Sequence, residues 1–246
     1  MYVNKKYFVL GFSERNQKMT KQRKRQLIVD LVLITVITFV VLAIIVLIGD
    51  RMNDFTYDQS INIVIRVAVI GICGQFGVAG LGISIACLIR KEKFTGFGLT
   101  VKNLIPAILL SSACCVPDFL YNLYRGDVQA WCPFREVNMT AEVLTSPFPY
   151  NILAYLITAV CWGFFEGFNY VVIRDKVSEL FPSKYRFLDW GALICALMCL
   201  AIHGAIGVNL SMVVTFILIY GMLIVRKETG NAWGCVLIFM AYWNAL

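Results

Sequence analysis

Apolar runs long enough to cross a lipid bilayer occupy most of this 246-residue chain. A membrane-spanning helix needs ~20 mostly apolar residues, because hydrocarbon contains no water to satisfy an irregular backbone. Hydrophobic residues make up 59% of the chain and charged residues 15%, whereas about 25% of an ordinary soluble domain is charged. The sequence therefore predicts an all-α, polytopic transmembrane helical bundle in an integral membrane protein.

Seven spans can be placed along the sequence. They cover residues 27–48, 61–89, 104–124, 150–173, 188–207, 210–225 and 232–246. The last holds only about 15 residues, so the sequence does not decide whether it crosses the whole bilayer. Because spans and short connections consume the chain, we expect a basic N-terminal segment, 1–26, followed by a single transmembrane domain, 27–246. Residues 1–25 lack the order of regions found in a signal peptide.

The distribution of basic residues predicts the orientation. On this assignment 18 of the 22 Lys and Arg residues lie in the N-terminal segment and in every second connection; the other four are Arg51, Arg66, Arg125 and Arg135. By the positive-inside rule, the N-terminus and residues 174–186 are then cytoplasmic, and residues 125–149 are not. The run KQRKRQ at 21–26 could also form a lipid-headgroup or nucleic-acid patch. A topology anchor is the simpler interpretation, and we expect no nucleic-acid partner.

Three polar residues lie in otherwise apolar runs, and they are the candidates for a buried site. Glu166 lies in CWGFFEGFNYVVIRDK, His203 in LMCLAIHGAIG and Asn244 in IFMAYWNAL. An ionised carboxylate in hydrocarbon is costly, so Glu166 should face protein or a water-filled cavity and have a partner. Gly163 and Gly167 around it form a GxxxG pair that lets another helix approach closely. We expect that helix to bring His203 within hydrogen-bonding reach of Glu166.

The span 61–89 contains small residues at a regular spacing. Gly71, Gly74, Gly77 and Gly80 recur every third residue. Close packing of helices explains them better than a phosphate-binding loop, which would need a following Lys-Ser/Thr and a preceding strand. In the same span we expect Arg66 to snorkel towards the membrane surface and Gln75 to form a hydrogen bond to another helix. Pro117 predicts a kink in the third span.

The nine cysteines contain no CxxC pair and do not indicate a disulfide framework. Cys195, Cys199 and His203 lie at i, i+4 and i+8, on one face of a helix, and their side chains are good zinc ligands. Such a linear set spans about 12 Å of helix rise and cannot complete a tetrahedron alone. The sequence thus leaves metal binding undecided and indicates no cofactor.

Residues 161–246 resemble the CAAX protease and bacteriocin-processing family of intramembrane proteins, whose conserved core would correspond to about 150–246 here. That family carries Glu-Glu-x-x-x-Arg, then Phe-x-x-x-His, then a last span introduced by a sequence like Arg-Thr-Gly-Ser-Leu-Trp. This chain has Glu166-Gly167, Cys199-x-x-x-His203 and KETGNAWGCVLIF, in which Thr229, Gly230 and Trp233 match. It departs from the family at Gly167, Val171 and Phe239, where a second Glu, the Arg and a second His are usual.

The resemblance implies an intramembrane endopeptidase that acts on a peptide or a lipidated protein segment within the bilayer. Glu166 would activate water, His203 would assist it, and Asn244 would bind the oxyanion. Because of the three departures, a second functional class is also possible: a non-catalytic pseudoprotease that serves as a binding or immunity-type membrane protein. A small transporter is a third class, but the inverted repeat it would need is not seen.

One difficulty concerns depth in the membrane. If the fourth span ends at residue 173, Glu166 lies about 10 Å from the cytoplasmic face. If the fifth span begins at residue 187, His203 lies about 24 Å from the same face. Contact between them requires the fifth span to begin later or the fourth to sit deeper.

Overall fold

The apolar runs of the sequence form helices. A computed structural model describes residues 19–128, 130–137, 139–202, 209–243 and 245, and every regular element within these residues is helical. Five helices are long and apolar enough to cross a membrane: Lys21–Leu47, Ile63–Arg90, Leu104–Arg125, Tyr150–Leu180 and Leu210–Thr229. Trp190–Ile202 and Trp233–Trp243 are apolar but shorter. The all-α prediction is confirmed, and the five long helices fit an integral, multi-pass membrane protein.

The long helices are built from shorter elements. In chain order these are α2 (Lys21–Leu47), α3 (Gly49–Tyr57), α4 (Ile63–Val69), η1 (Ile70–Leu81), α5 (Gly82–Arg90), η2 (Phe94–Phe97), α6 (Leu104–Cys114), α7 (Val116–Arg125), α8 (Thr140–Thr145), α9 (Tyr150–Thr158), η3 (Ala159–Phe165), α10 (Glu166–Leu180), α11 (Trp190–Ile202), α12 (Leu210–Thr229), α13 (Trp233–Ile238) and η4 (Phe239–Trp243). The segments η1, η3 and η4 are π-helical, and η2 is a short 3₁₀-helix.

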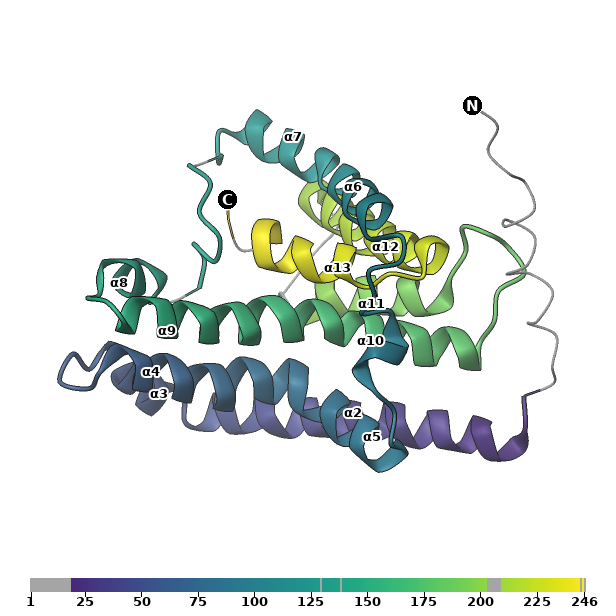
Figure 1. Ribbon diagram of the computed structural model, residues 1–246, viewed down its shortest axis with the longest axis horizontal. Coiled ribbons are helices and arrows are strands. Elements are labelled where there is room, and N and C mark those ends of the chain that lie inside the picture. Colours follow the sequence, from purple (N-terminus) through teal and green to yellow (C-terminus); the bar gives the residue numbers. More distant parts are fainter. Residues whose placement is uncertain (1–18, 129, 138, 203–208, 244, 246) are drawn as a thin grey trace.

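The continuous helix α9–η3–α10 is the centre of the bundle (Figure 1). On one side it packs against η1 and α2, and on the other against α11 and α13. Phe168, Val171 and Val172 of α10 are completely buried in the main apolar core. By contrast, α2 exposes a large apolar surface that includes Val32 and Phe39. Such a surface suits contact with lipid, where apolar side chains lose nothing by facing outwards.

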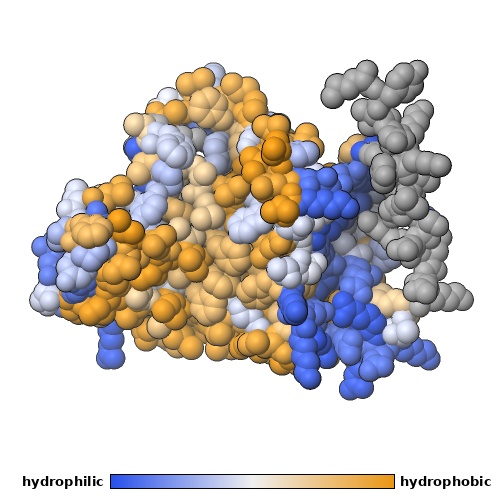
Figure 2. Space-filling view, viewed as in Figure 1, coloured by the Kyte–Doolittle hydropathy of each residue, from blue (hydrophilic) through white to orange (hydrophobic). Residues whose placement is uncertain are grey.

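Charged residues gather at one end of the bundle, which we call the polar end (Figure 2). Ion pairs there join Arg23 to Glu179 and Arg226 to Asp175. The start of α2 and the ends of α10 and α12 therefore lie together. This agrees with the expectation that the N-terminal segment and residues 174–186 share one side of the membrane.

Two helices extend beyond their predicted bounds. α2 begins six residues early, at Lys21, because Thr20 caps it by accepting a hydrogen bond from the Arg23 amide at 3.1 Å. α10 continues past residue 173 to Leu180 although it carries Arg174 and Lys176. Both side chains are paired inside the protein, with Asp189 and Asp30 respectively, so the helix need not end where the charges begin.

The helix is interrupted near Pro117, where a kink is expected: α6 ends at Cys114 and α7 begins at Val116. The expectation that Arg66 snorkels is wrong. Its side chain is 2% exposed, pairs with Glu142 of α8 and donates to the Thr56 carbonyl at 2.8 Å. The connection after α7 folds back and supplies this carboxylate, so Arg66 has no need to reach water.

The evenly spaced glycines pack closely, as predicted. A Cβ atom on Gly71 would lie 3.1 Å from Cys161 and Trp162, and one on Gly77 would lie 3.0 Å from Val41. These glycines let η1 approach both η3 and α2.

Candidate functional site

Glu166 lies near the middle of the central helix, at the junction of η3 and α10. It is about 24 Å of helix rise from Tyr150, so it would sit deep in a bilayer. Its Oε2 accepts a hydrogen bond of 2.9 Å from Nε2 of Gln75, which lies halfway along the Ile63–Arg90 helix. The prediction of an interhelical hydrogen bond for Gln75 is confirmed. That its partner would be Glu166 was not foreseen.

Three π-helical segments meet around this contact. They contain 12, 7 and 5 residues, and η3 packs against both η1 and η4. π-Helical turns are rare and occur frequently at functional sites. Gln75 lies within η1, Glu166 directly follows η3, and Phe239 begins η4. The wider turns therefore coincide with the residues singled out by their chemistry.

The glycine pair around Glu166 receives the C-terminal helix. A Cβ atom on Gly167 would lie 3.0 Å from the Cα of Val236 and from the Phe239 ring, and one on Gly163 would overlap Met240. The predicted close approach is thus confirmed, but the helix that approaches is α13–η4 and not the one leading to His203. Gly234 of α13 instead allows a close approach to α6, because a Cβ atom on it would lie 2.6 Å from the Ala107 carbonyl oxygen.

Helix α11 runs antiparallel to α10 and approaches Glu166 from another direction. The Cys195 thiol donates to the Tyr170 carbonyl at 3.5 Å. One turn later, Cys199 lies beside the Tyr170 hydroxyl and within electrostatic range of Glu166. Both helix ends differ from the bounds used for the depth estimate, because α11 begins at Trp190 and α10 continues to Leu180. His203 and Asn244 lie outside the described residues, so their contacts with Glu166 stay predictions.

Two positions that depart from the family pattern are filled by apolar side chains. Phe239 is completely buried, and its ring stacks on Tyr170 with centroids 5.4 Å apart. Val171 is also completely buried. The nearest arginine, Arg174, is directed to the polar end, where its Nη2 lies 2.5 Å from Asp189. Within the described residues, Arg174 therefore does not take the place of an arginine at residue 171.

The connection after α7 covers the far end of η4. Trp131 donates from Nε1 to the Ala241 carbonyl at 2.7 Å, and the Cys132 amide donates to the Ala245 carbonyl at 3.2 Å. Phe134 is 2% exposed, and its ring tip would lie 3.1 Å from a Cβ atom on Gly163. Sequence reasoning treated residues 125–149 as a plain connection and missed this cover. The available signal was two aromatic residues flanking Cys-Pro within a polar stretch.

The described residues hold no group of three or more His, Cys, Asp and Glu side chains able to bind a metal ion. Cys195 and Cys199 are both buried, and the third member of the predicted set, His203, lies outside this part of the chain.

Comparisons with protein-family models, with curated proteins and with solved structures each found no match. A functional conclusion therefore depends on the geometry of the site and on the resemblance of residues 161–246.

Proposed function

We propose that this chain is an intramembrane endopeptidase of the CAAX-protease-like type, in which Glu166 activates water for attack on a peptide bond. The observation that carries the proposal is a carboxylate near the middle of the long apolar central helix that accepts a hydrogen bond from the Gln75 amide, where three π-helical segments meet. A hydrogen bond donated to the carboxylate stabilises its ionised form, which is the form that accepts a proton from water. The substrate would be a peptide or lipidated protein segment within the bilayer.

The remaining roles follow the resemblance. His203 would assist Glu166, and Asn244 would bind the developing oxyanion. The position of Cys199 supports the first role, because Cys199 lies beside Tyr170, which follows Glu166 by four residues, and precedes His203 by four residues in the sequence.

The proposed topology has seven membrane segments and a cytoplasmic N-terminus. Both short helices, α11 and α13–η4, begin near the polar end, as segments entering from the same side as the N-terminus would. The last is 11 residues long by its described bounds, about 16 Å, and residues 131–134 cover its far end. A final segment that stops within the bilayer fits this arrangement.

A specific observation favours a second candidate, a non-catalytic pseudoprotease that binds such segments. Phe239 cannot donate a hydrogen bond, and its ring is fixed against Tyr170. Loss of one oxyanion donor costs an enzyme roughly 10²–10³ in rate. A bundle that lacks this donor would hold a substrate without cleaving it.

Three purified proteins in detergent distinguish the two candidates: wild type, Glu166→Gln and Phe239→His. Each is incubated with prenylated and unmodified peptides, and products are identified by mass spectrometry. The proposal expects cleavage by wild type and a loss of roughly 10²-fold or more in Glu166→Gln. Glu228→Gln, which removes a carboxylate at the polar end that pairs with Arg186, is the matched control and should retain activity.

Other outcomes are equally informative. If wild type is inactive and Phe239→His cleaves, the chain is a pseudoprotease. If Glu166→Gln cleaves as fast as wild type, Glu166 is not the base and the proposal fails.

A further inference from the structure

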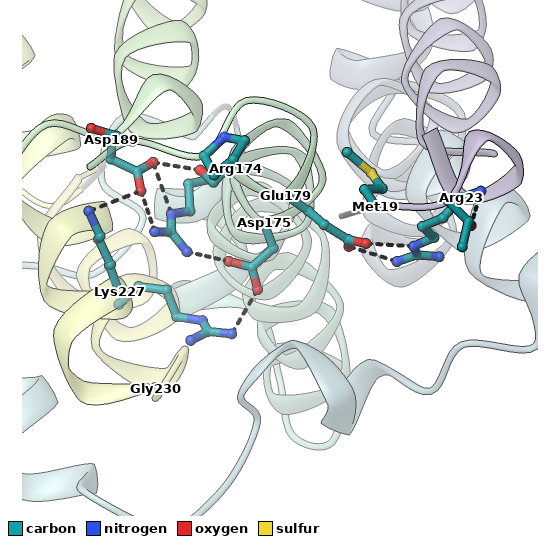
Figure 3. Close-up of a pocket in the computed structure, with 13 residues that line it drawn as sticks. Met19, Arg23, Arg174, Asp175, Glu179, Asp189, Lys227 and Gly230 are labelled. Atoms are coloured by element: carbon teal, nitrogen blue, oxygen red, sulfur yellow. Dashed lines mark hydrogen bonds and ion pairs between the residues drawn. The ribbon is translucent and has the colours of Figure 1, made fainter. Parts of the chain in front are cut away.

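A cavity of about 900 Å³ opens at the polar end (Figure 3). It lies between the start of α2, the last turns of α10 and the end of α12. Its closest lining residue on the central helix, Arg174, is eight positions beyond Glu166, or about 12 Å of helix rise. The cavity is therefore separate from the proposed catalytic centre.

Charged side chains form much of its lining. Four are basic and three are acidic: Arg23, Arg174, Arg226, Lys227, Asp175, Glu179 and Asp189. Arg174, Arg226 and Asp189 are more than nine-tenths buried. Buried charges of this kind are costly unless hydrogen-bonded partners compensate them.

The acidic side chains already have cationic partners. Asp175 accepts from Arg174 on one oxygen and from Arg226 on the other, each at 2.7 Å. Both oxygens of Glu179 accept from Arg23, at 2.6 and 2.8 Å. Asp189 accepts from Arg174, Ser178 and the Ala192 amide. No carboxylate oxygen of the lining thus lacks a donor.

Asp189 is ionised at neutral pH. Burial raises the pKa of its carboxyl, but the charge of Arg174 and the hydrogen bonds from Ser178 and Arg174 outweigh burial and hold the pKa below its usual value. The ion pairs of the lining are therefore formed under physiological conditions.

One nitrogen of the Arg226 guanidinium group, Nη1, is available to bind a ligand. Its Nε donates to the Phe97 carbonyl at 3.1 Å and its Nη2 donates to Asp175. Within the described residues its Nη1 makes no hydrogen bond, although the side chain is only 10% exposed. The lining thus offers a guanidinium group with N–H donors on Nη1 that make no hydrogen bond, whereas its carboxylates already accept hydrogen bonds. A ligand that pairs with this guanidinium group must therefore be a hydrogen-bond acceptor.

We propose that this cavity binds a phosphate-bearing anion, with the Nη1 edge of Arg226 as its principal donor. A guanidinium group matches two oxygens of a phosphate, and the excess of basic over acidic lining residues favours an anion. A volume of about 900 Å³ leaves room for a substituent on the phosphate. Two sources share this chemistry: the headgroup of an anionic phospholipid, reached at the membrane surface, and a soluble phosphate ester.

The test compares an internal anion with its neutral isostere. Ser183 lines the cavity, and its Oγ accepts from the Tyr185 amide at 3.1 Å. Asp and Asn can both keep that local hydrogen bond. Ser183→Asp places a negative charge in the cavity, whereas Ser183→Asn does not. Arg226→Gln removes the proposed donor directly.

Two kinds of measurement separate the two sources. Soluble phosphate is probed by the unfolding temperature of the full chain in neutral detergent, with inorganic phosphate or glycerol phosphate titrated against chloride at equal ionic strength. Lipid is probed by native mass spectrometry after reconstitution with phosphatidylglycerol or with phosphatidylcholine alone. The arm that saturates identifies the source.

We expect wild type and Ser183→Asn to bind alike, and Ser183→Asp and Arg226→Gln to bind about tenfold more weakly or worse. If Arg226→Gln does not fold, the Ser183 pair decides the question. The proposal is overturned if wild type binds neither class of probe saturably, or if Ser183→Asp binds as tightly as Ser183→Asn.

Discussion

At the scale of single residues, buried charges are where the fold depends most on pairing. Lys176 is buried and donates to Asp30 at 3.0 Å and to Glu92 at 2.7 Å. Burial raises the pKa of the Glu92 carboxyl, but hydrogen bonds and charge from Lys176 and Arg23 outweigh burial, so the pKa is lowered overall. The side chains of Lys176 and Asp30 are each 2% exposed, so neither charge could recover its hydration if the other were removed.

Lys176→Met should therefore lower the free energy of unfolding by about 3 kcal/mol, the lower end of the usual cost of breaking a buried pair, because Asp30 keeps its ion pair with Arg90. The matched control is Arg186→Met, whose pair with Glu228 is 48% and 28% exposed. Its loss should be below about 1 kcal/mol. Both are measured by denaturant unfolding in detergent. Equal losses in the two variants would show that burial does not determine the strength of these pairs.

The sequence could identify the polar residues of the site but not their pairing. Glu166 and Gln75 each stand out because a polar side chain in an apolar span is costly. Their contact joins residues 91 positions apart and depends on how two helices are rotated against one another. The same limit explains Arg66, whose partner Glu142 lies in a connection with no hydropathy signal.

At the scale of elements, hydropathy located the helices but not their ends or their internal geometry. α10 continues through Arg174 and Lys176 because tertiary ion pairs satisfy both charges, which a hydropathy window cannot register. The π-helical segments also have no residue pattern of their own. They appear where glycines and aromatic side chains pack between helices, as at Gly80 against Phe165.

Two glycines at helix ends give a matched test of close packing. Gly98 and Gly126 both have positive φ, +90° and +74°. A Cβ atom on Gly98 would lie 2.6 Å from the Gly230 carbonyl oxygen and 2.9 Å from Cζ of Arg226, whereas one on Gly126 would meet nothing within 4 Å.

Gly126→Ala should therefore cost about 1 kcal/mol, from backbone strain alone. Gly98→Ala should cost about 2–4 kcal/mol, because the added methyl group also displaces the end of α12. Thermal unfolding of both variants in the same detergent measures the difference. Indistinguishable losses would mean that residues 98 and 230 are not in close contact in the folded protein.

At the scale of the whole molecule, charge and hydropathy divide the bundle along its length. The polar end collects the start of α2 and the ends of α5, α10 and α12. At the other end, α8 and residues 131–134 close over α4 and η4. By the positive-inside rule, the basic segments gathered at the polar end predict that this end faces the cytoplasm.

The orientation is tested with single cysteines at the two ends. One variant is Lys184→Cys, because Lys184 is exposed in the connection after α10. The other is Thr145→Cys, because Thr145 is exposed at the end of α8. One long helix, Tyr150–Leu180, separates them and is long and apolar enough to cross a membrane, so we expect them on opposite sides. A membrane-impermeant maleimide should label Thr145→Cys on intact cells and Lys184→Cys only after permeabilisation. Both variants are made in a background with Cys73, Cys114 and Cys132 replaced by serine, because these three are not buried. The reverse pattern would invert the proposed orientation, and labelling of both residues from one side would show that the central helix does not cross the membrane.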